Sequence, residues 1–406
     1  MPTTPDTVPV TEVSRRGYTT PAPFRELWRE TPVRSFAGPD GRTDWLVTGM
    51  EQVRAVLSDP RFSRAEARRL GAVIGPAAIF RKPGINDLDP PEQTRLRRLV
   101  ASAFTARRIR ALRPRIQEIT DGLIGRLVAA GPPADLADGL CRRLPIAVIF
   151  EILGVPPGDH DRFRGWAERV TSTGAFPPEE AMGALTEMVA YMSGLVAAKR
   201  RHPDHSLLND LVTARDEQDR LSEDELVTLG CGLLLAGNES TGTMLGKGLV
   251  ALLDHPGQLD ALRADPSLVP NAVEEMLRYA TLGIPAYGGH IRATTCDVEL
   301  GEVTIPAHSV VYACMPAANL DPAAFHDPDR FDVTRADAGD HVTFGHGIHH
   351  CLGAQLARLE MEVALGSVVA AFPGLRLTVP AAELPYREGF LITGLRELPV
   401  TWEVSG

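Results

Sequence analysis

The sequence contains few cysteines and no paired cysteine motif. Its cysteines number five, no C-x-x-C pair occurs, and they are scattered at Cys141, Cys231, Cys296, Cys314 and Cys351. An odd, scattered set does not form a disulfide framework and is typical of a reducing compartment. We therefore expect free thiols, with Cys351 as the one possible exception.

The chain also lacks excess basic charge and an apolar N-terminal run. Its net charge of -10 argues against a nucleic-acid partner, although a local basic patch is still compatible with it. Prolines, acids and threonines fill the first 17 residues, where a signal peptide or a membrane anchor needs continuous apolar sequence. We expect a cytoplasmic protein that binds no membrane.

No linker rich in glycine, serine or proline divides the sequence, and no repeat is evident. The residues are 44% hydrophobic and 23% charged, which is typical of a globular protein. We predict a flexible N-terminal tail over residues 1–12 and a single domain over residues 13–406.

Most of the chain has helical periodicity. Two β-like runs flank the turn residues between Val33 and Val47, and residues 297–305 are typical of a second hairpin. The predicted fold class is mainly α with a smaller β portion. The clearest predicted helices span residues 115–130, 182–200, 222–253, 270–280 and 352–372.

The predicted helix after Ser222 has a strong start signal and an unusual glycine content. Ser222 and Glu225 have the spacing of a capping box. Each glycine costs roughly 1 kcal/mol in a helix interior. A flat ligand lying close, a local opening of the helix, or tight helix packing would each explain the six that follow, which are Gly230, Gly232, Gly237, Gly242, Gly246 and Gly248.

Cys351 lies where a glycine-bearing loop runs into an amphipathic helix. Free N–H groups and the positive dipole end at a helix start favour a thiolate over a thiol, which suits a metal ligand. Gly345, Gly347 and Gly353 allow the backbone to turn and to lie against a planar group, and Phe344 is an apolar shield.

Two other interpretations of this loop remain. Nearby histidines could form a zinc site with Cys351, although their spacing is not that of a usual zinc motif and zinc does not require the phenylalanine or the glycines. The histidines concerned are His341, His346, His349 and His350. Cys351 could also be an inert buried cysteine.

Phe344, Gly347, Cys351 and Gly353 match the pattern F-x-x-G-x-x-x-C-x-G, and with it the sequence resembles the cytochrome P450 family. The resemblance implies a fold in which haem b lies between the long glycine-rich helix and the cysteine helix. Cys351 would be the axial ligand of the haem iron, and thiolate ligation favours O–O cleavage.

Further matches extend over most of the chain. Glu275 and Arg278 fit the family's E-x-x-R motif, and Arg330 fits the later arginine that joins this pair in a buried ion network. By resemblance, Arg97, Arg292 and His349 would bind the haem propionates, which require cations or hydrogen-bond donors. Gln93 stands where the family usually has a histidine.

The segment from Ala236 to Thr241 resembles the family's oxygen-activation motif. Ala236 and Gly237 would lie against the haem, with Gly237 leaving room for dioxygen. Glu239 and Ser240 align with the acid and the alcohol that deliver protons to dioxygen. The family normally has threonine at the position of Ser240; serine keeps the hydroxyl but loses the methyl group that restrains it.

The resemblance implies a monooxygenase that oxidises a small molecule, and few aromatics and no dominant charge occur in the expected pocket segments. We therefore expect an apolar or heteroaromatic metabolite of natural-product biosynthesis, bound by Leu235, Ile284, Pro285 and Phe390. Oxidative coupling or ring closure without oxygen insertion, for example of a cyclic dipeptide, is one alternative. A haem-binding gas sensor without turnover is another. The pocket segments are residues 64–88, 168–180, 233–240, 282–288 and 388–392.

The sequence shows neither a dinucleotide fingerprint nor an iron-sulfur cysteine set. Electrons from NAD(P)H would therefore arrive through a ferredoxin reductase and a ferredoxin. Eight arginines lie between Arg95 and Arg115, and we expect an acidic ferredoxin to dock there, with Arg108 and Arg110 as contacts.

Overall fold

The computed structural model describes residues 17–20, 31–38, 41–72, 83–101, 104–216, 221–283 and 290–404. The chain forms two compact units, each assembled from segments that are distant in sequence. Unit 1 comprises Met1–Val73 and Lys247–Cys351, and unit 2 comprises Ile74–Gly246 and Leu352–Gly406. The single domain over residues 13–406 stays a prediction, and the predicted tail over residues 1–12 lies outside the described residues.

Unit 1 is built on a five-stranded sheet with the order β1-β2-β8-β5-β3. The predicted first hairpin is confirmed, because β1 and β2 pair antiparallel with Val33 opposite Val47. The second is confirmed as the pair β6-β7. The strands are β1 (Val33–Ala37), β2 (Thr43–Val47), β3 (Phe62–Ser63), β5 (His290–Thr294), β6 (Val298–Leu300), β7 (Val303–Ile305) and β8 (Val310–Ala313).

Short helices complete unit 1. Residues from the sheet and from α2 form a common hydrophobic core in which Val47, Val53 and Val311 are fully buried. The helices are α2 (Met50–Ser58), α3 (Arg64–Arg69), α13 (Pro256–Ala264), α14 (Val269–Tyr279) and α15 (Met315–Ala318).

A buried ion network is centred on α14. The carboxylate of Glu275 accepts hydrogen bonds from Nε and Nη2 of Arg278 at 2.7 and 2.8 Å, and neither side chain is exposed. The third charged member is Arg335, whose Nε lies 3.3 Å from the same carboxylate. The expectation that Arg330 joins the pair is wrong: its side chain is 62% exposed and faces Asp332, and only its carbonyl oxygen accepts from Arg278.

Unit 2 is mainly helical, with a small three-stranded sheet in the order β4-β10-β9. Four of the five predicted helices correspond to α7, α10, α12 and α16, and the fifth corresponds to α14 of unit 1. The elements are α5 (Glu92–Ala101), α6 (Ala106–Ala111), α7 (Arg113–Ala130), β4 (Ala134–Asp135), α8 (Arg143–Leu153), α9 (His160–Val170), α10 (Pro178–Arg201), α11 (Leu207–Asp216), α12 (Glu223–Asp254, whose last eight residues belong to unit 1), α16 (Ala354–Ala371), β9 (Arg376–Leu377) and β10 (Pro399–Thr401).

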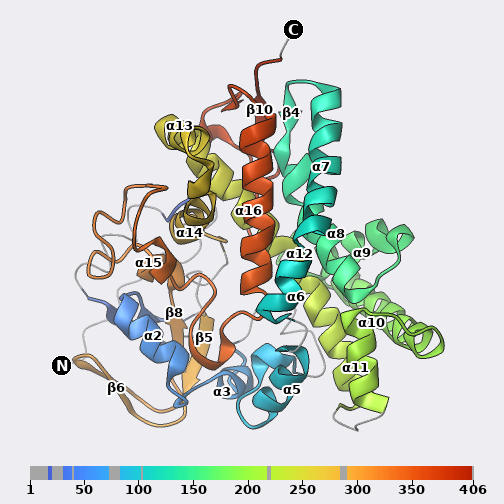
Figure 1. Ribbon diagram of the computed structural model, residues 1–406. Helices are drawn as coiled ribbons and strands as arrows, with labels where there is room; N and C mark the ends of the chain where they lie inside the picture. The colour runs from blue at the N-terminus through green and yellow to red at the C-terminus, as the bar shows by residue number, and fades with distance from the viewer. Residues whose placement is uncertain are drawn as a thin grey trace. The chain divides into compact units, whose positions relative to one another are not determined.

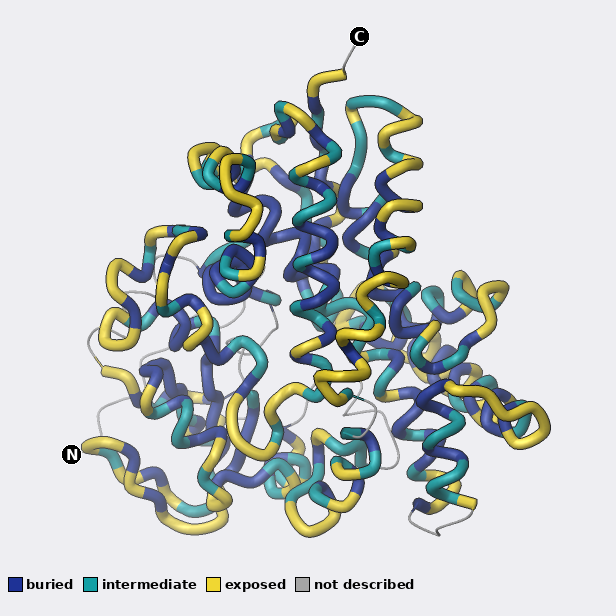
Figure 2. Tube along the Cα trace, in the orientation of Figure 1, coloured by how far each residue is buried: buried dark blue, intermediate teal, exposed yellow. Residues whose placement is uncertain are grey.

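Within unit 2, α16 packs along α7 and also touches α6 and α8 (Figure 1). The buried residues of α7 recur at helical spacing as Ile116, Thr120, Leu123 and Ile124. The remaining face of α7 is largely exposed, as the yellow turns of Figure 2 show. This amphipathic pattern orients the helix that follows the cysteine loop in the sequence.

Helix α10 has the length and the composition of a membrane span, with a mean hydropathy of 1.3 over its most apolar window. In this structure its apolar side is part of the core of unit 2. Met188, Met192 and Val196 are fully buried there, against residues of α8, α9 and α11. Burial of this kind is also expected for a core helix of a globular protein.

The start of α12 confirms the predicted capping box. The backbone N–H of Ser222 donates to Glu225 Oε2 at 2.8 Å, and the N–H of Glu225 donates to Ser222 Oγ at 3.2 Å. The helix then continues for 32 residues without interruption. A local opening, one of the three explanations for its glycines, is therefore not observed.

Tight packing accounts for several glycines of α12. A Cβ at Gly237 would lie 2.9 Å from Ile149 Cγ1 of α8, and one at Gly242 would overlap the carbonyl oxygen of Cys141. Gly230 is pressed against α10 in the same way. These positions require glycine because a neighbouring element occupies the space of the side chain.

Candidate active site

The cysteine loop of unit 1 is shaped by two glycines in the left-handed region. Gly345 has φ +75° and Gly347 has φ +69°. A Cβ at Gly347 would lie 2.6 Å from the carbonyl oxygen of Leu57, so backbone passes where a side chain would stand. The N–H of Cys351 donates to the carbonyl oxygen of Phe344 at 2.8 Å and closes the loop.

The buried network on α14 also anchors this loop. Arg278 Nη1 donates to the carbonyl oxygen of Asn319 at 3.0 Å. The amide side chain of Asn319 in turn accepts from the N–H of Val342 at 2.8 Å and donates to Thr343 Oγ1 at 2.7 Å. Thr343 completes the chain by donating to the carbonyl oxygen of Leu277 on α14 at 2.6 Å. The loop therefore begins from a hydrogen-bonded and largely buried base.

The cysteines differ in environment. Burial raises the pKa of the thiols of Cys141, Cys231 and Cys314 to about 12, so these three are inert at neutral pH. Cys351 is exposed at the end of its loop, and Cys296 is the other exposed thiol. This finding contradicts the interpretation of Cys351 as an inert buried cysteine.

The histidines around Cys351 do not support a zinc site. His341 is buried and its Nε2 lies 3.1 Å from Glu274 Oε2, whereas His346 and His350 are exposed. Among the described residues, no group of three or more histidine, cysteine, aspartate or glutamate side chains is arranged to hold a metal ion.

A cluster of cationic groups lies beside the cysteine loop in unit 1. Arg292, at the centre of β5, is only 1% exposed. Burial, together with the nearby positive charges of Arg292, Arg64 and His349, lowers the pKa of His290 well below its usual range. His290 Cε1 in turn lies 4.0 Å from the position that a Cβ would take at Gly345.

These cationic groups suit a cofactor that carries carboxylates. Buried guanidinium groups bind carboxylates well because they offer several fixed donors. The sequence prediction named Arg292 and His349. It missed Arg64 and His290, which have no sequence signal beyond being basic or aromatic. A haem bound through sulfur fits three features of this site. These are an exposed cysteine, left-handed glycines that let the backbone approach closely, and this cluster.

Unit 2 carries the predicted oxygen-activation segment on an open part of α12. Ala236 is exposed and Ser240 is half-buried, whereas residues 242–250 of the same helix are all buried. The hydroxyl of Ser240 donates to the carbonyl oxygen of Ala236 at 3.0 Å. A flat ligand has space along this stretch. Packing on α8 already explains Gly237, and its contact with dioxygen stays a prediction.

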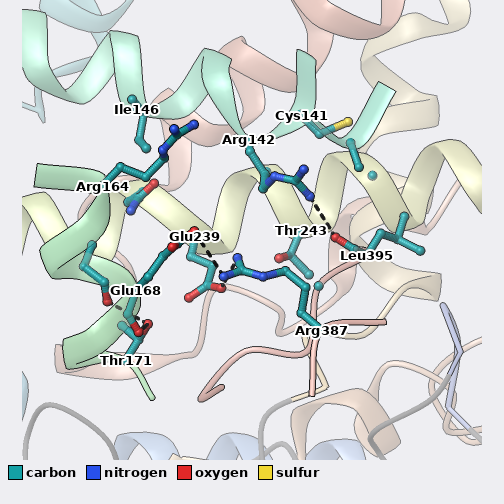
Figure 3. Close-up of a pocket in the computed structure, with 16 residues that line it drawn as sticks. Cys141, Arg142, Ile146, Arg164, Glu168, Thr171, Glu239, Thr243, Arg387 and Leu395 are labelled. Atoms are coloured by element: carbon teal, nitrogen blue, oxygen red, sulfur yellow. Dashed lines mark hydrogen bonds and ion pairs between the residues drawn. The ribbon is translucent and has the colours of Figure 1, made fainter. Parts of the chain in front are cut away.

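Glu239 points into a cavity of about 40 Å³ in unit 2, which Figure 3 shows in close-up. Its Oε1 accepts from Arg387 Nη1 at 3.3 Å, and Arg387 Nη2 donates to Glu168 Oε1 at 3.2 Å. Burial raises the pKa of the Glu239 carboxyl above its usual value. The sequence prediction included Glu239 and missed Arg387 and Glu168. Arg387 lies 148 residues from Glu239 and 219 residues from Glu168 in the sequence.

Other predicted cofactor contacts are distributed over unit 2. Arg97 is half-buried on α5. On the same helix, Gln93 is 1% exposed, and its Oε1 accepts from Thr94 Oγ1 at 3.3 Å. Gly353 is the residue that caps the start of α16.

Of the predicted substrate contacts, two can be described. Leu235 on α12 is partly buried against the core of unit 2. The ring of Phe390 lies edge-on to Phe176 with centroids 6.2 Å apart. Ile284 and Pro285 lie outside the described residues.

Comparisons with known proteins identify the family of this chain. Residues 184–379 match the family model for cytochrome P450. Mycinamicin IV hydroxylase/epoxidase from Micromonospora griseorubida is 45% identical over 387 residues, covering 95% of this chain and 96% of that protein. The LnmA P450 hydroxylase of the leinamycin pathway from Streptomyces atroolivaceus aligns with a TM-score of 0.86 at 45% identity, covering 95% and 97% of the two chains.

A third structure is of SgvP, provisionally assigned as the thioether synthase in griseoviridin tailoring. It aligns with a TM-score of 0.89 at 40% identity and covers 99% of this chain and 100% of that one. Similarity at this level over nearly the whole length shows the family as well as the fold. The chain therefore belongs to the cytochrome P450 family of haem-dependent oxidoreductases.

Proposed function

We propose that this P450 uses dioxygen to insert one oxygen atom into a small apolar or heteroaromatic natural product in the cytoplasm. The observation that carries the proposal is the exposed Cys351 at the end of a glycine loop directly before α16. The names of the relatives support the reaction, because one is a mycinamicin IV hydroxylase/epoxidase and another is a hydroxylase of the leinamycin biosynthetic pathway.

Haem b, which the family uses, supplies the activation of dioxygen and the oxidation of substrate when it is bound. In this chain, Cys351 would hold the haem iron through its sulfur, and Phe344 and Gly345 would contact the cofactor. Arg97, Arg292 and His349 would bind the propionates. The buried Arg292 suits this task because a propionate would neutralise its charge.

Glu239 and Ser240 would move protons. The Ser240 hydroxyl uses its hydrogen on the carbonyl oxygen of Ala236, so its lone pairs are available to accept a second hydrogen bond. Burial raises the pKa of the Glu239 carboxyl, so it keeps its proton to a higher pH than an exposed glutamate does, which suits a proton donor. Consecutive residues of a helix do not face each other, so in this proposal water carries the proton from Glu239 to Ser240.

Substrate would bind beside Leu235 and Phe390, which offer apolar contact. A second candidate function is oxidative bond formation without oxygen insertion, because SgvP is assigned to thioether synthesis. Hydroxylation has the stronger support, since the relatives named hydroxylases reach 45% identity and SgvP reaches 40%.

The proposal is tested by the mass of the product formed under ¹⁸O-labelled dioxygen. We expect a product that gains a single labelled oxygen atom, with no label when only the water is enriched. A product that instead loses two hydrogens and carries no label would contradict oxygen insertion and favour bond formation. A spectral shift on oxygen binding, without consumption of oxygen when electron donors and candidate substrates are present, would support the gas-sensing alternative.

Replacing the Ser240 hydroxyl should uncouple electron use from product formation. In Ser240→Ala we expect normal haem content and a several-fold larger share of reducing equivalents diverted to peroxide, because a hydrogen-bonding group of the proton path is lost. Ser240→Thr keeps the hydroxyl, adds a methyl group and should couple at least as well as the wild type. Equal coupling in the wild type and the alanine variant would assign the role to another donor.

Members of this family take electrons from redox partners, and we propose an acidic ferredoxin for this chain. Several arginines of the predicted segment are engaged in ion pairs: Arg108 with Asp210 at 2.8 Å, Arg113 with Glu362, and Arg115 with Glu151. Arg95 is likewise paired with a glutamate.

Two arginines of α6 are more available for docking. Within the described part of the chain, Arg107 and Arg110 have no carboxylate at ion-pair distance, and both are exposed. Helix α6 packs against α16, the helix that follows Cys351. Arg110 is therefore a stronger candidate contact than Arg108, whose charge is already neutralised by an acid.

Reversing the charge at Arg107 or Arg110 to glutamate should slow reduction by ferredoxin several-fold at low salt. The deficit should shrink as salt rises, because rim charges act mainly through steering and are screened over about 10 Å at 0.1 M salt. Arg126→Glu is the matched control, since Arg126 is exposed on α7 about 20 Å along the helix from its start. Equal stopped-flow rates in all four proteins would remove α6 as the docking surface.

A further inference from the structure

The cavity at Glu239 is bordered by charged groups from four elements. Glu168 and Arg164 come from α9, Glu239 from α12, Arg142 from the turn before α8, and Arg387 from the segment before β10. Figure 3 shows the side chains of Glu168, Glu239 and Arg387 directed toward one another. The guanidinium of Arg387 binds both carboxylates, which would otherwise repel each other.

Arg387 is the centre of this arrangement. One of its terminal nitrogens donates to Glu239 at 3.3 Å and the other donates to Glu168 at 3.2 Å. Its guanidinium carbon lies 4.2 Å from the centre of the Phe390 ring, which supports the plane of the group from one side. The side chains of Arg387 and Glu239 are only 15% and 16% exposed, so solvent screens this pair weakly, whereas Glu168 is 40% exposed.

The backbone fixes where Arg387 stands. Its N–H donates to the carbonyl oxygen of Gly394 at 2.8 Å, as part of a turned-back segment. That segment is bound to the residues after α9, because Thr173 donates to the Gly389 carbonyl oxygen at 2.7 Å and Leu391 donates to that of Thr171 at 2.8 Å.

Gly389 lets the two segments approach closely. It has φ +79°, and a Cβ there would lie 2.6 Å from the backbone nitrogen of Ala175. The backbone that carries Arg387 is therefore fixed by main-chain hydrogen bonds, so its guanidinium reaches Glu239 from an ordered segment.

We propose that Arg387 is a positioning residue that holds Glu239 for proton delivery by dividing its guanidinium between Glu239 and Glu168. The inference rests on the proposed role of Glu239 and adds that the division of this charge sets the pH range in which the acid can donate. Loss of either partner of Arg387 shifts that range, and the two losses shift it in opposite directions.

The remaining groups around Glu239 do not reverse the direction of these two pH shifts. Burial raises the pKa of the Glu239 carboxyl and the negative charge of Glu168 adds to the rise, whereas Arg387, Arg142 and a hydrogen bond with Thr171 lower it. Arg142 is engaged elsewhere, donating to the carbonyl oxygens of residues 395 and 396 at 3.0 Å.

Two further titratable groups line the cavity. Arg164 pairs with Asp161 at 3.4 Å, which directs its charge toward solvent. The pKa of the Cys141 thiol is about 12, so this group stays neutral throughout the pH range of interest. Removing Glu168 or Arg387 should therefore change the pKa of Glu239 in a definite direction.

The test is an infrared titration of the ferric haem protein without turnover, following the protonated carboxyl band that is absent in Glu239→Gln. In Arg387→Gln the midpoint should move to higher pH, because a positive charge beside Glu239 is lost. In Glu168→Gln it should move to lower pH, because a negative charge is lost and Arg387 turns fully to Glu239. Arg387→Lys keeps the charge without the fork and should restore part of the wild-type midpoint.

The falling limb of product formation against pH should move in the same two directions. Arg164→Gln, which removes a positive charge from the same cavity without a contact to Glu239, should leave both midpoints in place. Midpoints that stay fixed in both Arg387→Gln and Glu168→Gln, or move the same way, would overturn the proposal. If Glu239→Gln itself leaves the activity profile unchanged, the proton role of Glu239 fails, and the infrared midpoints still decide the positioning role.

Discussion

The buried guanidinium of Arg278 is the constraint on which the site in unit 1 depends. It has no exposed surface and is satisfied by Glu275 together with three backbone carbonyl oxygens, among them that of Asn319. Removing one partner of a buried pair costs about 3–5 kcal/mol, because the other charge then has no compensation. The position of Asn319 is therefore fixed, and with it the base of the cysteine loop.

The loop built on this base fixes the position of Cys351. Asn319 holds Val342, and beyond it the chain turns through Gly345 and Gly347. The second of these glycines admits the backbone of residues 57 and 58 at a distance that no side chain would allow. The backbone N–H of Cys351 then donates to the carbonyl oxygen of Phe344 and closes the loop. The ion network on α14, the two glycines and Cys351 are thus linked by continuous contacts. This explains why the E-x-x-R motif and the cysteine motif, which lie far apart in the sequence, are required together.

Local signals in the sequence predicted much of this structure. The capping box at Ser222 gave the start of α12 to within one residue, and the turn residues between β1 and β2 gave the correct hairpin. These predictions were accurate because periodicity, caps and turns depend on neighbours in the chain. The E-x-x-R pair was also predicted correctly, since both of its members lie on one helix turn of α14.

Contacts between distant segments could not be predicted in the same way. Arg330 and Arg335 lie close in sequence, and only the packed structure shows that the second of them enters the network of Glu275. Arg387 lies far along the chain from Glu239 and has no distinguishing pattern around it. The glycines of α12 were ambiguous because a packed helix and a flat ligand require the same absence of side chains, and Gly237 faces Ile149.

Sulfur ligation by Cys351 is the central claim, and the ferrous carbonyl spectrum tests it most directly. We predict that the wild type shows the red-shifted Soret band of a thiolate-bound haem, and that Cys351→Ala loses it. Cys296→Ala, which removes the other exposed thiol, should keep the band. Retention of the band in Cys351→Ala, or its loss in Cys296→Ala, would contradict the account.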